Sequence, residues 1–290
     1  MIESNADAFE KFRKNNLDIV FNFSENANGI SREAQIPAML DMLNIPYTGS
    51  DPLTLTSCLD KARTKEILTY HKIPTPNFII IEGHNLDSDV SLNYPLILKP
   101  IGEGSSKGIF NSSLINNFEE LKKQTELMLK KYNQAFILEE YLPGREFTVA
   151  LIGNKDETEV LPIIELNFNS LPKEVNPIYS FEAKWIFDTK ENQLDLYTCP
   201  SNIDSELENK IKNTSLAAYK ALRCKDWSRI DIRLDINGIP NIIEINPLPG
   251  VLPDPKDNSC FPKAARVAGM NYDELINSVL YHASKRYNLI

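Results

Sequence analysis

Two carboxylates on a predicted β-hairpin are the residues most able to do chemistry in this sequence. Alternating residues flank Asn237-Gly238 within the segment 229–246, the strongest short-range signal for a two-residue type I′ turn. In that register Asp231 lies directly opposite Glu244 on one face. The other face is apolar and is expected to join the core: Ile230, Ile232, Leu234, Ile236, Ile239, Ile243 and Ile245.

Carboxylates that face each other on a sheet repel, so either one carries a proton or a cation lies between them. Asn246 shares their face and lies opposite Arg229. Two carboxylates and an amide oxygen are hard ligands that suit magnesium with a bound phosphate. The alternative is a solvated outer face on which Arg229 and Arg233 balance the carboxylates. A longer turn would shift the pairing but keep the same faces.

A glycine-rich loop at residues 102–108 follows an apolar strand that ends in Lys99. Glycines let backbone N–H groups approach an anion, and serines add hydroxyl donors. The glycine spacing and the missing terminal Lys-Ser/Thr exclude a Walker P-loop, and no helix opens within the loop as a dinucleotide-binding fingerprint requires. Lys99 is placed to reach a phosphate held by the loop. A plain surface turn and a strand-end lysine that snorkels to solvent are the competing interpretations.

Three further carboxylates lie at a strand end and just beyond it. Glu139 and Glu140 end a predicted strand and could present backbone groups and a carboxylate to a base and a ribose, as could Glu146. A solvated acidic pair is the alternative. The hairpin, the loop and Lys99 together suggest chemistry on a nucleoside triphosphate, which needs phosphate donors, a bridging cation and positioned charges.

Composition limits the class of protein. The chain has 290 residues, ordinary hydrophobic and charged fractions and a net charge of −9, which argues against a nucleic-acid-binding surface. The four cysteines have no metal-type spacing and read as reduced thiols. No apolar run approaches membrane-spanning length, and the N-terminus does not resemble a signal peptide. The expected location is therefore the cytoplasm.

Strands and helices alternate too irregularly for a doubly wound sheet, so the expected class is α+β (mixed α/β). The predicted strands cover residues 18–23, 77–81, 95–100, 135–142, 147–152 and 159–164, beside the hairpin. The predicted helices cover residues 7–15, 37–43, 55–71, 118–132, 205–221 and 262–287. The stretch 166–188 reads as an ordered loop.

Five runs in order give the chain a family resemblance. They are Pro46-Tyr-Thr-Gly-Ser50, Leu59 to Lys65, Leu98 to Ser106, Leu138 to Val149 and Ile243 to Gly250. In these runs the chain resembles D-alanine–D-alanine ligases of the ATP-grasp superfamily, from about residue 18 to the C-terminus. The resemblance implies an ATP-grasp fold after a partial N-terminal α/β subdomain (1–57), with a central subdomain (58–139) and a C-terminal subdomain with the metal site (140–290).

The resemblance also implies cofactors and roles. ATP phosphates would contact Lys61 and Lys99, the adenine would lie at Glu139 and Leu142, and the ribose would face Glu146. Three hairpin residues would hold magnesium, manganese being the alternative ion: Asp231, Glu244 and Asn246. Ser105 would lie on the loop over the phosphates, and Arg229 with the Gly250 backbone would stabilise an oxyanion.

The implied reaction has two steps. A substrate carboxylate attacks the γ-phosphate of ATP to give an acyl phosphate, and an amine then displaces phosphate to form an amide. Cations lower the repulsion between the anionic nucleophile and the anionic phosphate. Small amino acids are the implied substrates, and a homodimer is the expected assembly, with no nucleic-acid or membrane partner.

The chain departs from the family on its amino-acid side. The family begins with a fuller N-terminal unit, and the chain is expected to start too late to contain it. Ser31 to Ala34 replaces the Gly-Glu-Asp-Gly of the family. Trp185 follows Lys184 where the family has a Lys-Tyr pair, so the phenol hydroxyl is lost. Ser259 still aligns with a serine that contacts the substrate carboxylate.

Three functions remain open at this point. The first is D-alanine–D-alanine ligation, and the second is ligation of other amino acids, such as an L-amino-acid or natural-product dipeptide. The third is ATP binding without ligase activity, because of the N-terminal shortening. The ATP side of the site is expected to be intact and the amino-acid side to be altered.

Overall fold

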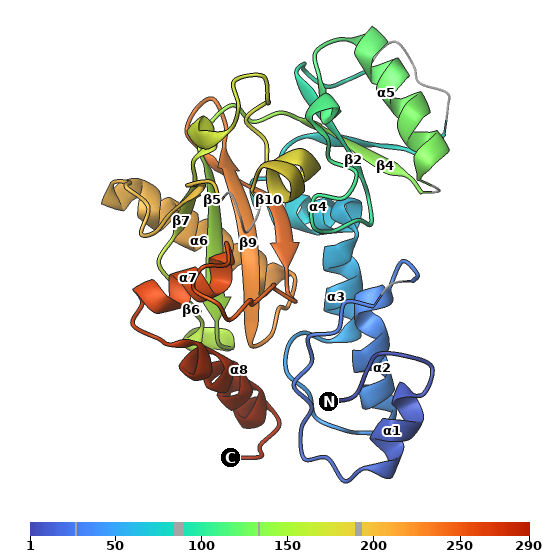
Figure 1. Cartoon of the computed structure of the whole chain (residues 1–290), viewed down its shortest axis with the longest axis vertical. Helices are drawn as coiled ribbons and strands as arrows, with labels where there is room; N and C mark the ends of the chain where they lie inside the picture. The colour runs from blue at the N-terminus through green and yellow to red at the C-terminus, as the bar shows by residue number, and fades with distance from the viewer. Residues whose placement is uncertain (27, 84–89, 133, 189–192) are drawn as a thin grey trace.

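Two antiparallel sheets with helices packed against them form the framework of the molecule (Figure 1). The computed structural model describes residues 1–26, 28–83, 90–132, 134–188 and 193–290. Every strand pairing within the two sheets is antiparallel over these residues. The predicted α+β class is confirmed.

The smaller sheet carries the candidate nucleotide-binding residues that come from the middle of the chain. Its strand order is β1-β4-β2-β3, with bounds Phe78–Ile81 (β1), Leu96–Pro100 (β2), Leu114–Ile115 (β3) and Phe136–Glu140 (β4). Helix α5 (Phe118–Lys131) buries Leu121 and Met128 in a cluster with Leu96, Leu98 and Phe136 of this sheet. The predicted elements in this region are confirmed to within two residues at each end.

The larger sheet carries the hairpin. Its order is β10-β9-β5-β7-β8, and β6 pairs with β5. The bounds are Glu146–Ile152 (β5), Glu159–Val160 (β6), Ile164–Leu166 (β7), Tyr197–Thr198 (β8), Trp227–Leu234 (β9) and Pro240–Asn246 (β10). The single strand predicted at 159–164 is wrong, because two short strands pair separately with β5.

Helices cover both faces of the larger sheet. Helix α6 (Ser205–Ala221) packs on one face with the side chains of Ile230, Ile232 and Ile245. Helices α7 (Cys260–Val267) and α8 (Tyr272–Arg286) contribute to the cluster that contains Trp227. The helical character predicted for the C-terminal segment 262–287 is confirmed, and Gly269, with a positive φ of 89° after α7, separates the two helices.

The N-terminal segment is largely helical. Helices α1 (Ala8–Lys14) and α2 (Gln35–Met42) are confirmed, and they share a core with Tyr47. The strand predicted at 18–23 is wrong, because only Val20 forms a bridge, to Tyr47, and no longer pairing extends it in the described residues.

The helix predicted at 55–71 is two helices, α3 (Pro52–Leu59) and α4 (Lys61–Tyr70). Asp60 separates them in extended conformation, with φ −84° and ψ 104°. Its carboxylate accepts hydrogen bonds from the N–H groups of Ala62 and Arg63, so it caps α4. The break makes Lys61 the first residue of α4.

Five short helical turns complete the described elements. Four are 3-10 turns, at Arg32–Ala34, Asn111–Ser113, Lys155–Glu157 and Phe168–Ser170. The fifth is a π-helical turn at Ala183–Phe187. Within the stretch predicted as a loop, 166–188, the chain therefore forms one 3-10 turn and this π turn.

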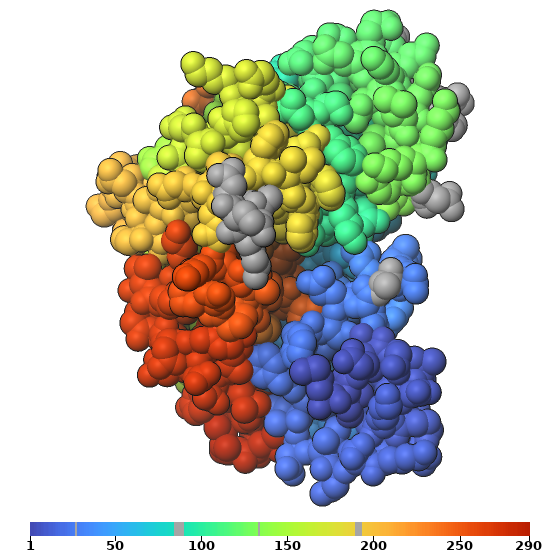
Figure 2. All heavy atoms as spheres, in the orientation of Figure 1, coloured from blue at the N-terminus to red at the C-terminus, as the bar shows by residue number. Residues whose placement is uncertain are grey.

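A buried aspartate joins the two ends of the chain. Asp226 is fully buried and accepts hydrogen bonds from Gly49 N–H, the Asn154 amide and the Arg286 guanidinium. Arg286 on α8 also donates to the carbonyls of Tyr47 and Gly49. Figure 2 shows the resulting contact of the N-terminal segment, in blue, with the C-terminal segment, in red.

Two expectations stay predictions. The structure describes two sheets, but the subdomain boundaries expected at residues 57/58 and 139/140 stay predictions. No helix in the described part of the chain has the length and apolar composition needed to cross a membrane. The cytoplasmic location stays a prediction as well.

Candidate active site

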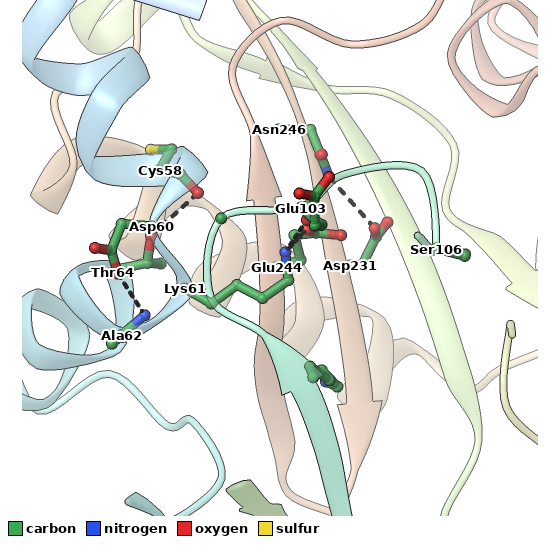
Figure 3. A network of polar contacts seen from close by, with 12 residues as sticks. Cys58, Asp60, Lys61, Ala62, Thr64, Glu103, Ser106, Asp231, Glu244 and Asn246 are labelled. Carbon is green, nitrogen blue, oxygen red and sulfur yellow. Dashed lines mark hydrogen bonds and ion pairs between the residues drawn. The ribbon is translucent and has the colours of Figure 1, made fainter. Parts of the chain in front are cut away.

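The hairpin places its carboxylates as predicted, although its turn and its strand register differ from the prediction. Asp231 on β9 pairs with Glu244 on β10, and Arg229 pairs with Asn246. The Asp231 carboxylate accepts hydrogen bonds from Thr148 Oγ1 on β5 at 2.6 Å and from the Arg229 guanidinium at 3.0 and 3.1 Å. The Asn246 amide is 3.4 Å from Asp231 Oδ2, so its side chain points into the same group (Figure 3).

The two-residue turn is wrong. Leu234 pairs with Pro240, so the loop between the strands is longer than predicted, and Ile242 pairs with Ile232. A β-bulge between Ile242 and Glu244 adds one residue to β10, and this restores the predicted Asp231–Glu244 pairing.

The bulge also changes the predicted apolar face. Ile242, not Ile243, is fully buried in the core, and Ile243 lines the cavity on the polar side. Ile236 and Ile239 lie in the loop, where they are exposed. Ile230, Ile232, Leu234 and Ile245 are buried in the core as predicted.

Lys61 is the cation nearest to Glu244. Its Nζ lies 2.8 Å from Glu244 Oε1 and also donates to the Glu103 carbonyl of the glycine-rich loop (Figure 3). Burial alone would raise the pKa of Glu244, but Lys61, Arg229 and Lys99 outweigh burial and lower it. Glu244 is therefore a carboxylate at neutral pH, and the charge conflict expected across the hairpin is resolved by protein cations on both sides.

A hard metal ion fits the donors at the open side of this pair. Among the described residues, no group of three or more His, Cys, Asp or Glu side chains could hold a metal by itself. A metal here would use Asp231, Glu244 and the Asn246 oxygen, with phosphate oxygens from a ligand completing the shell. Asp231 and Glu244 side chains keep exposures of 20% and 25%, so solvent can reach both.

A buried cluster of charged side chains joins the smaller sheet to α4. Glu139 on β4 pairs with Lys99 on β2 at 3.0 Å and with Lys65 on α4 at 3.5 Å. Burial would raise the pKa of Glu139, but Lys65 and Lys99 lower it overall. Oε1 of Glu139 is buried and has no hydrogen-bond partner. Glu139 also lines the cavity, where a carboxylate acceptor suits an N–H donor of a ligand.

The neighbouring carboxylates differ in their partners. The Glu146 carboxylate accepts a hydrogen bond from Arg233 at 2.9 Å, and burial raises its pKa despite this contact. The Glu140 carboxylate instead accepts hydrogen bonds from Asn77 and Asn93. Its side chain is therefore already engaged, although the residue still borders the cavity, next to Leu142.

Two segments meet over the cavity. Trp185 on the π-helical turn donates its indole N–H to the Ser105 carbonyl of the glycine-rich loop at 3.2 Å. Ser106 Oγ donates to the Tyr179 carbonyl, and Phe181 N–H donates to the Ile109 carbonyl. Trp185 thus bridges the loop and the π turn.

The far end of the cavity is formed around the start of α7. Ser259 Oγ donates to the Gly250 carbonyl at 3.3 Å and accepts a hydrogen bond from Leu252 N–H. Lys184 lies on the same side, and burial together with the nearby Arg229 lowers its pKa.

Every residue named above as a catalytic, nucleotide or metal candidate lines one cavity of about 330 Å³. This places them together but does not test their roles. The cavity also contains residues that sequence reasoning missed: Thr148, Glu25, Tyr179, Tyr197 and Cys260. Thr148 could have been found, because it is on the polar face of β5, opposite Asp231. Glu25 and Tyr179 come from loops, Tyr197 from the short strand β8 and Cys260 from the first position of α7, and no periodicity marks them.

A second cavity of about 300 Å³ lies beside the first. The two share Glu25, Glu103, Ser105, Glu244, Asn246 and Leu248. The second is otherwise lined by Arg32, Glu33, Lys107 and neighbouring residues. Burial raises the pKa of Glu33 to about 7, with Arg32 opposing the shift. This cavity is thus polar, and the hairpin is part of its wall.

The sequence is similar to known proteins over most of its length. A family profile described as D-ala D-ala ligase C-terminus matches residues 67–281. An uncharacterised protein of Sinorhizobium fredii is 36% identical over 269 residues, which are 93% of this chain and 75% of that protein. A D-alanine–D-alanine ligase of Alcanivorax borkumensis is 32% identical over 251 residues, which are 87% of this chain and 73% of that one.

Solved structures are similar as well. A D-alanine–D-alanine ligase of Bacillus anthracis in complex with ATP gives a TM-score of 0.75 at 26% identity, covering 96% of this chain and 82% of that one. The VanG D-Ala:D-Ser ligase of Enterococcus faecalis gives a TM-score of 0.71 at 25% identity, covering 92% of this chain and 73% of that one.

Proposed function

The chain belongs to the D-alanine–D-alanine ligase family, and from this premise we propose that it is an ATP- and magnesium-dependent ligase that joins two small amino acids. The predicted ATP-grasp fold is confirmed by the likeness to the ligase structures. The observation that carries the proposal is the Asp231–Glu244 pair, which faces a cavity that Lys61, Lys99 and Arg229 also line.

The lysines and the hairpin would hold the triphosphate of ATP. Lys61 and Lys99 are nearly fully buried, so their charges act on a phosphate in a low-dielectric site. A magnesium ion on Asp231, Glu244 and Asn246 would neutralise charge between the γ-phosphate and an incoming carboxylate.

The carboxylate of Glu139 supports adenine as the base. Glu139 lines the cavity as an acceptor, and the exocyclic amine of adenine is a donor. Guanine presents a carbonyl at the corresponding ring position, which would leave two acceptors facing each other. We therefore expect ATP to be preferred over GTP.

The second cavity is the place we propose for the amino acid whose carboxylate is activated. It meets the first cavity at Glu244 and Asn246, so a carboxylate there would lie beside the hairpin that we expect to hold magnesium and the γ-phosphate. A carboxylate oxygen would bond to the γ-phosphorus as the bond to the ADP oxygen breaks. Glu25 lies at this cavity and could offer negative charge to the substrate ammonium group, and Glu33 would add to it as it ionises near pH 7.

The second step needs a positive charge beside the reacting carbonyl. Burial alone would lower the pKa of Arg229, but Asp231 and Glu244 raise it above its usual value, so the guanidinium stays charged. When the amine nitrogen attacks the acyl carbon, Arg229 and the backbone at Gly250 would stabilise the oxyanion, and phosphate leaves as the nitrogen loses a proton. Ser259, beside Gly250, would position the second substrate.

The identity of the amino acids is the less constrained part of the proposal. D-alanine is the first choice because of the named ligases, but Trp185 lacks a hydroxyl and already donates its N–H to Ser105. Arg32 and Glu33 place a second charged pair at the second cavity. These residues favour, as the second candidate, a ligase of the same chemistry for other amino acids.

A panel assay distinguishes the candidates. The protein is incubated with ATP, magnesium and single or paired D- and L-amino acids, and phosphate release is followed together with product mass. D-alanyl-D-alanine as the only product would support the first candidate, and a different dipeptide the second. ATP binding without amino-acid-dependent turnover would contradict both and leave a nucleotide-binding protein. The expected homodimer stays a prediction.

A further inference from the structure

The linker between α4 and β1 is bound to the open edge of the metal hairpin. β10 ends the strand order of the larger sheet, so one of its edges has no strand neighbour in the described part of the chain. At Ile242 the linker supplies hydrogen-bond partners for this open edge. The Ile242 N–H donates to the Pro74 carbonyl at 2.8 Å, and the Ile242 carbonyl accepts from Thr75 Oγ1 at 2.9 Å.

These contacts hold the residue that begins the bulge. Ile242 pairs with Ile232 and Glu244 pairs with Asp231, so Ile243 is the extra residue between them. A bulge re-aims the side chains that follow it. Without this one, a regular continuation of the Ile242–Ile232 register would turn Glu244 away from its place opposite Asp231.

A buried lysine fixes the direction of the Thr75 hydroxyl. Lys65 is 1% exposed and its Nζ donates to Thr75 Oγ1 at 2.8 Å. An ammonium group can only donate, so the Thr75 oxygen must accept from it, and the hydroxyl proton is left for the Ile242 carbonyl. Lys65 also pairs with Glu139, a residue that lines the nucleotide cavity.

We propose that Lys65 and Thr75 are positioning residues that link the base end of the nucleotide site to the metal hairpin, by holding the bulge that sets Glu244 opposite Asp231. Neither residue lines the cavity, so they act through Glu139 and Ile242 rather than on the substrate. The proposal rests on the proposed function in one respect, namely that the hairpin holds a metal bound to ATP.

The test removes the hydroxyl and keeps the side-chain shape. Thr75→Val cannot accept from Lys65 or donate to Ile242, whereas Thr75→Ser keeps both contacts. Thr158→Val is the matched control, because Thr158 Oγ1 also donates to a backbone carbonyl, that of Lys155, and lies outside both cavities. Two readouts are used: amide hydrogen exchange of residues 240–246 in the nucleotide-free protein, and calorimetric ATP affinity with and without magnesium.

The proposal expects faster exchange at residues 240–246 in Thr75→Val. It also expects the gain in ATP affinity that magnesium brings to fall about 5-fold, a typical effect of one lost hydrogen bond, while metal-free ATP affinity stays unchanged. Thr75→Ser and Thr158→Val should match the wild-type protein. Unchanged exchange, an unchanged magnesium effect, or an equal loss of affinity with and without magnesium would overturn the linkage.

Failure of the proposed function would look different. In that case the wild-type protein itself would show no magnesium-dependent ATP binding, and both the function and the linkage would be rejected together. A wild-type protein that binds ATP with magnesium, beside a Thr75→Val variant that behaves identically, would reject the linkage alone.

Discussion

Replacing Asp226 by alanine tests how the N-terminal segment, which contributes Glu25, Arg32 and Glu33 to the second cavity, is held on the larger sheet. The Asp226 carboxylate is fully buried and accepts from Gly49 N–H at 2.8 Å, from Asn154 at 2.7 Å and from Arg286 at 2.8 and 3.2 Å. The alanine variant would leave all three donors without their acceptor.

The magnitude follows from these contacts. Breaking a buried ion pair by removing one partner costs about 3–5 kcal/mol. The Arg286 side chain keeps an exposure of 22%, so water can partly replace the carboxylate, and the lower end, about 3 kcal/mol, is the appropriate value. With an unfolding entropy of about 2.1 cal/mol/K per residue, a chain of 290 residues should lose about 5 °C in melting temperature.

The assay is thermal unfolding by circular dichroism, with Lys285→Gln as control. Lys285 neighbours Arg286 on α8 and pairs with Glu157, but both side chains of that pair are largely exposed. Its loss should leave the melting temperature unchanged within error. The reasoning would be refuted if Asp226→Ala melted with the wild-type protein, or if both variants lost the same amount.

Two further predictions concern the cavities. Glu244→Gln should keep the fold but reduce ATP-dependent turnover by about 100-fold or more, because the carboxylate that binds the metal and its charge are lost together. Steady-state kinetics checks this, and wild-type turnover would exclude Glu244 as a metal ligand. Glu33 has a folded pKa of about 7 against 4.5 unfolded, so its contribution to stability is present below pH 4.5 and is lost as pH rises through 7. The stability of Glu33→Gln relative to the wild-type protein should therefore increase from pH 5 to pH 8. The increase should be less than about 3 kcal/mol, because Glu33 is partly exposed. Urea unfolding at both pH values measures it, and no increase would be seen if Glu33 titrated normally.

The hairpin shows what sequence patterns can and cannot specify. Alternation and the Asn237-Gly238 pair predict two strands and the Asp231–Glu244 pairing, which are correct. The length of the turn and the face on which Ile243 lies are not predictable from the hairpin sequence, because the bulge depends on a linker far away in sequence. Pro74 and Thr75 hold Ile242 from outside the hairpin, and no local pattern records that contact.

The helices show the same division. Asp60 carried a visible signal, since aspartate is a preferred N-cap, but the apolar residues on both sides of it read as one helix. The Val20 segment is apolar enough for a strand, yet a strand also needs a neighbour, and within the described residues this segment pairs only at Tyr47. Lys65 and Asp226 were missed because burial, not residue type, gives them their roles.

The central claim is that a substrate carboxylate attacks the γ-phosphate of ATP, and an isotope measurement tests it most directly. The amino acids that turn over are supplied with ¹⁸O in their carboxylates, and the phosphate and nucleotide products are analysed by mass spectrometry. The account predicts one ¹⁸O atom in inorganic phosphate for each dipeptide formed, with ADP unlabelled. Label in AMP, or unlabelled phosphate beside the dipeptide, would contradict it.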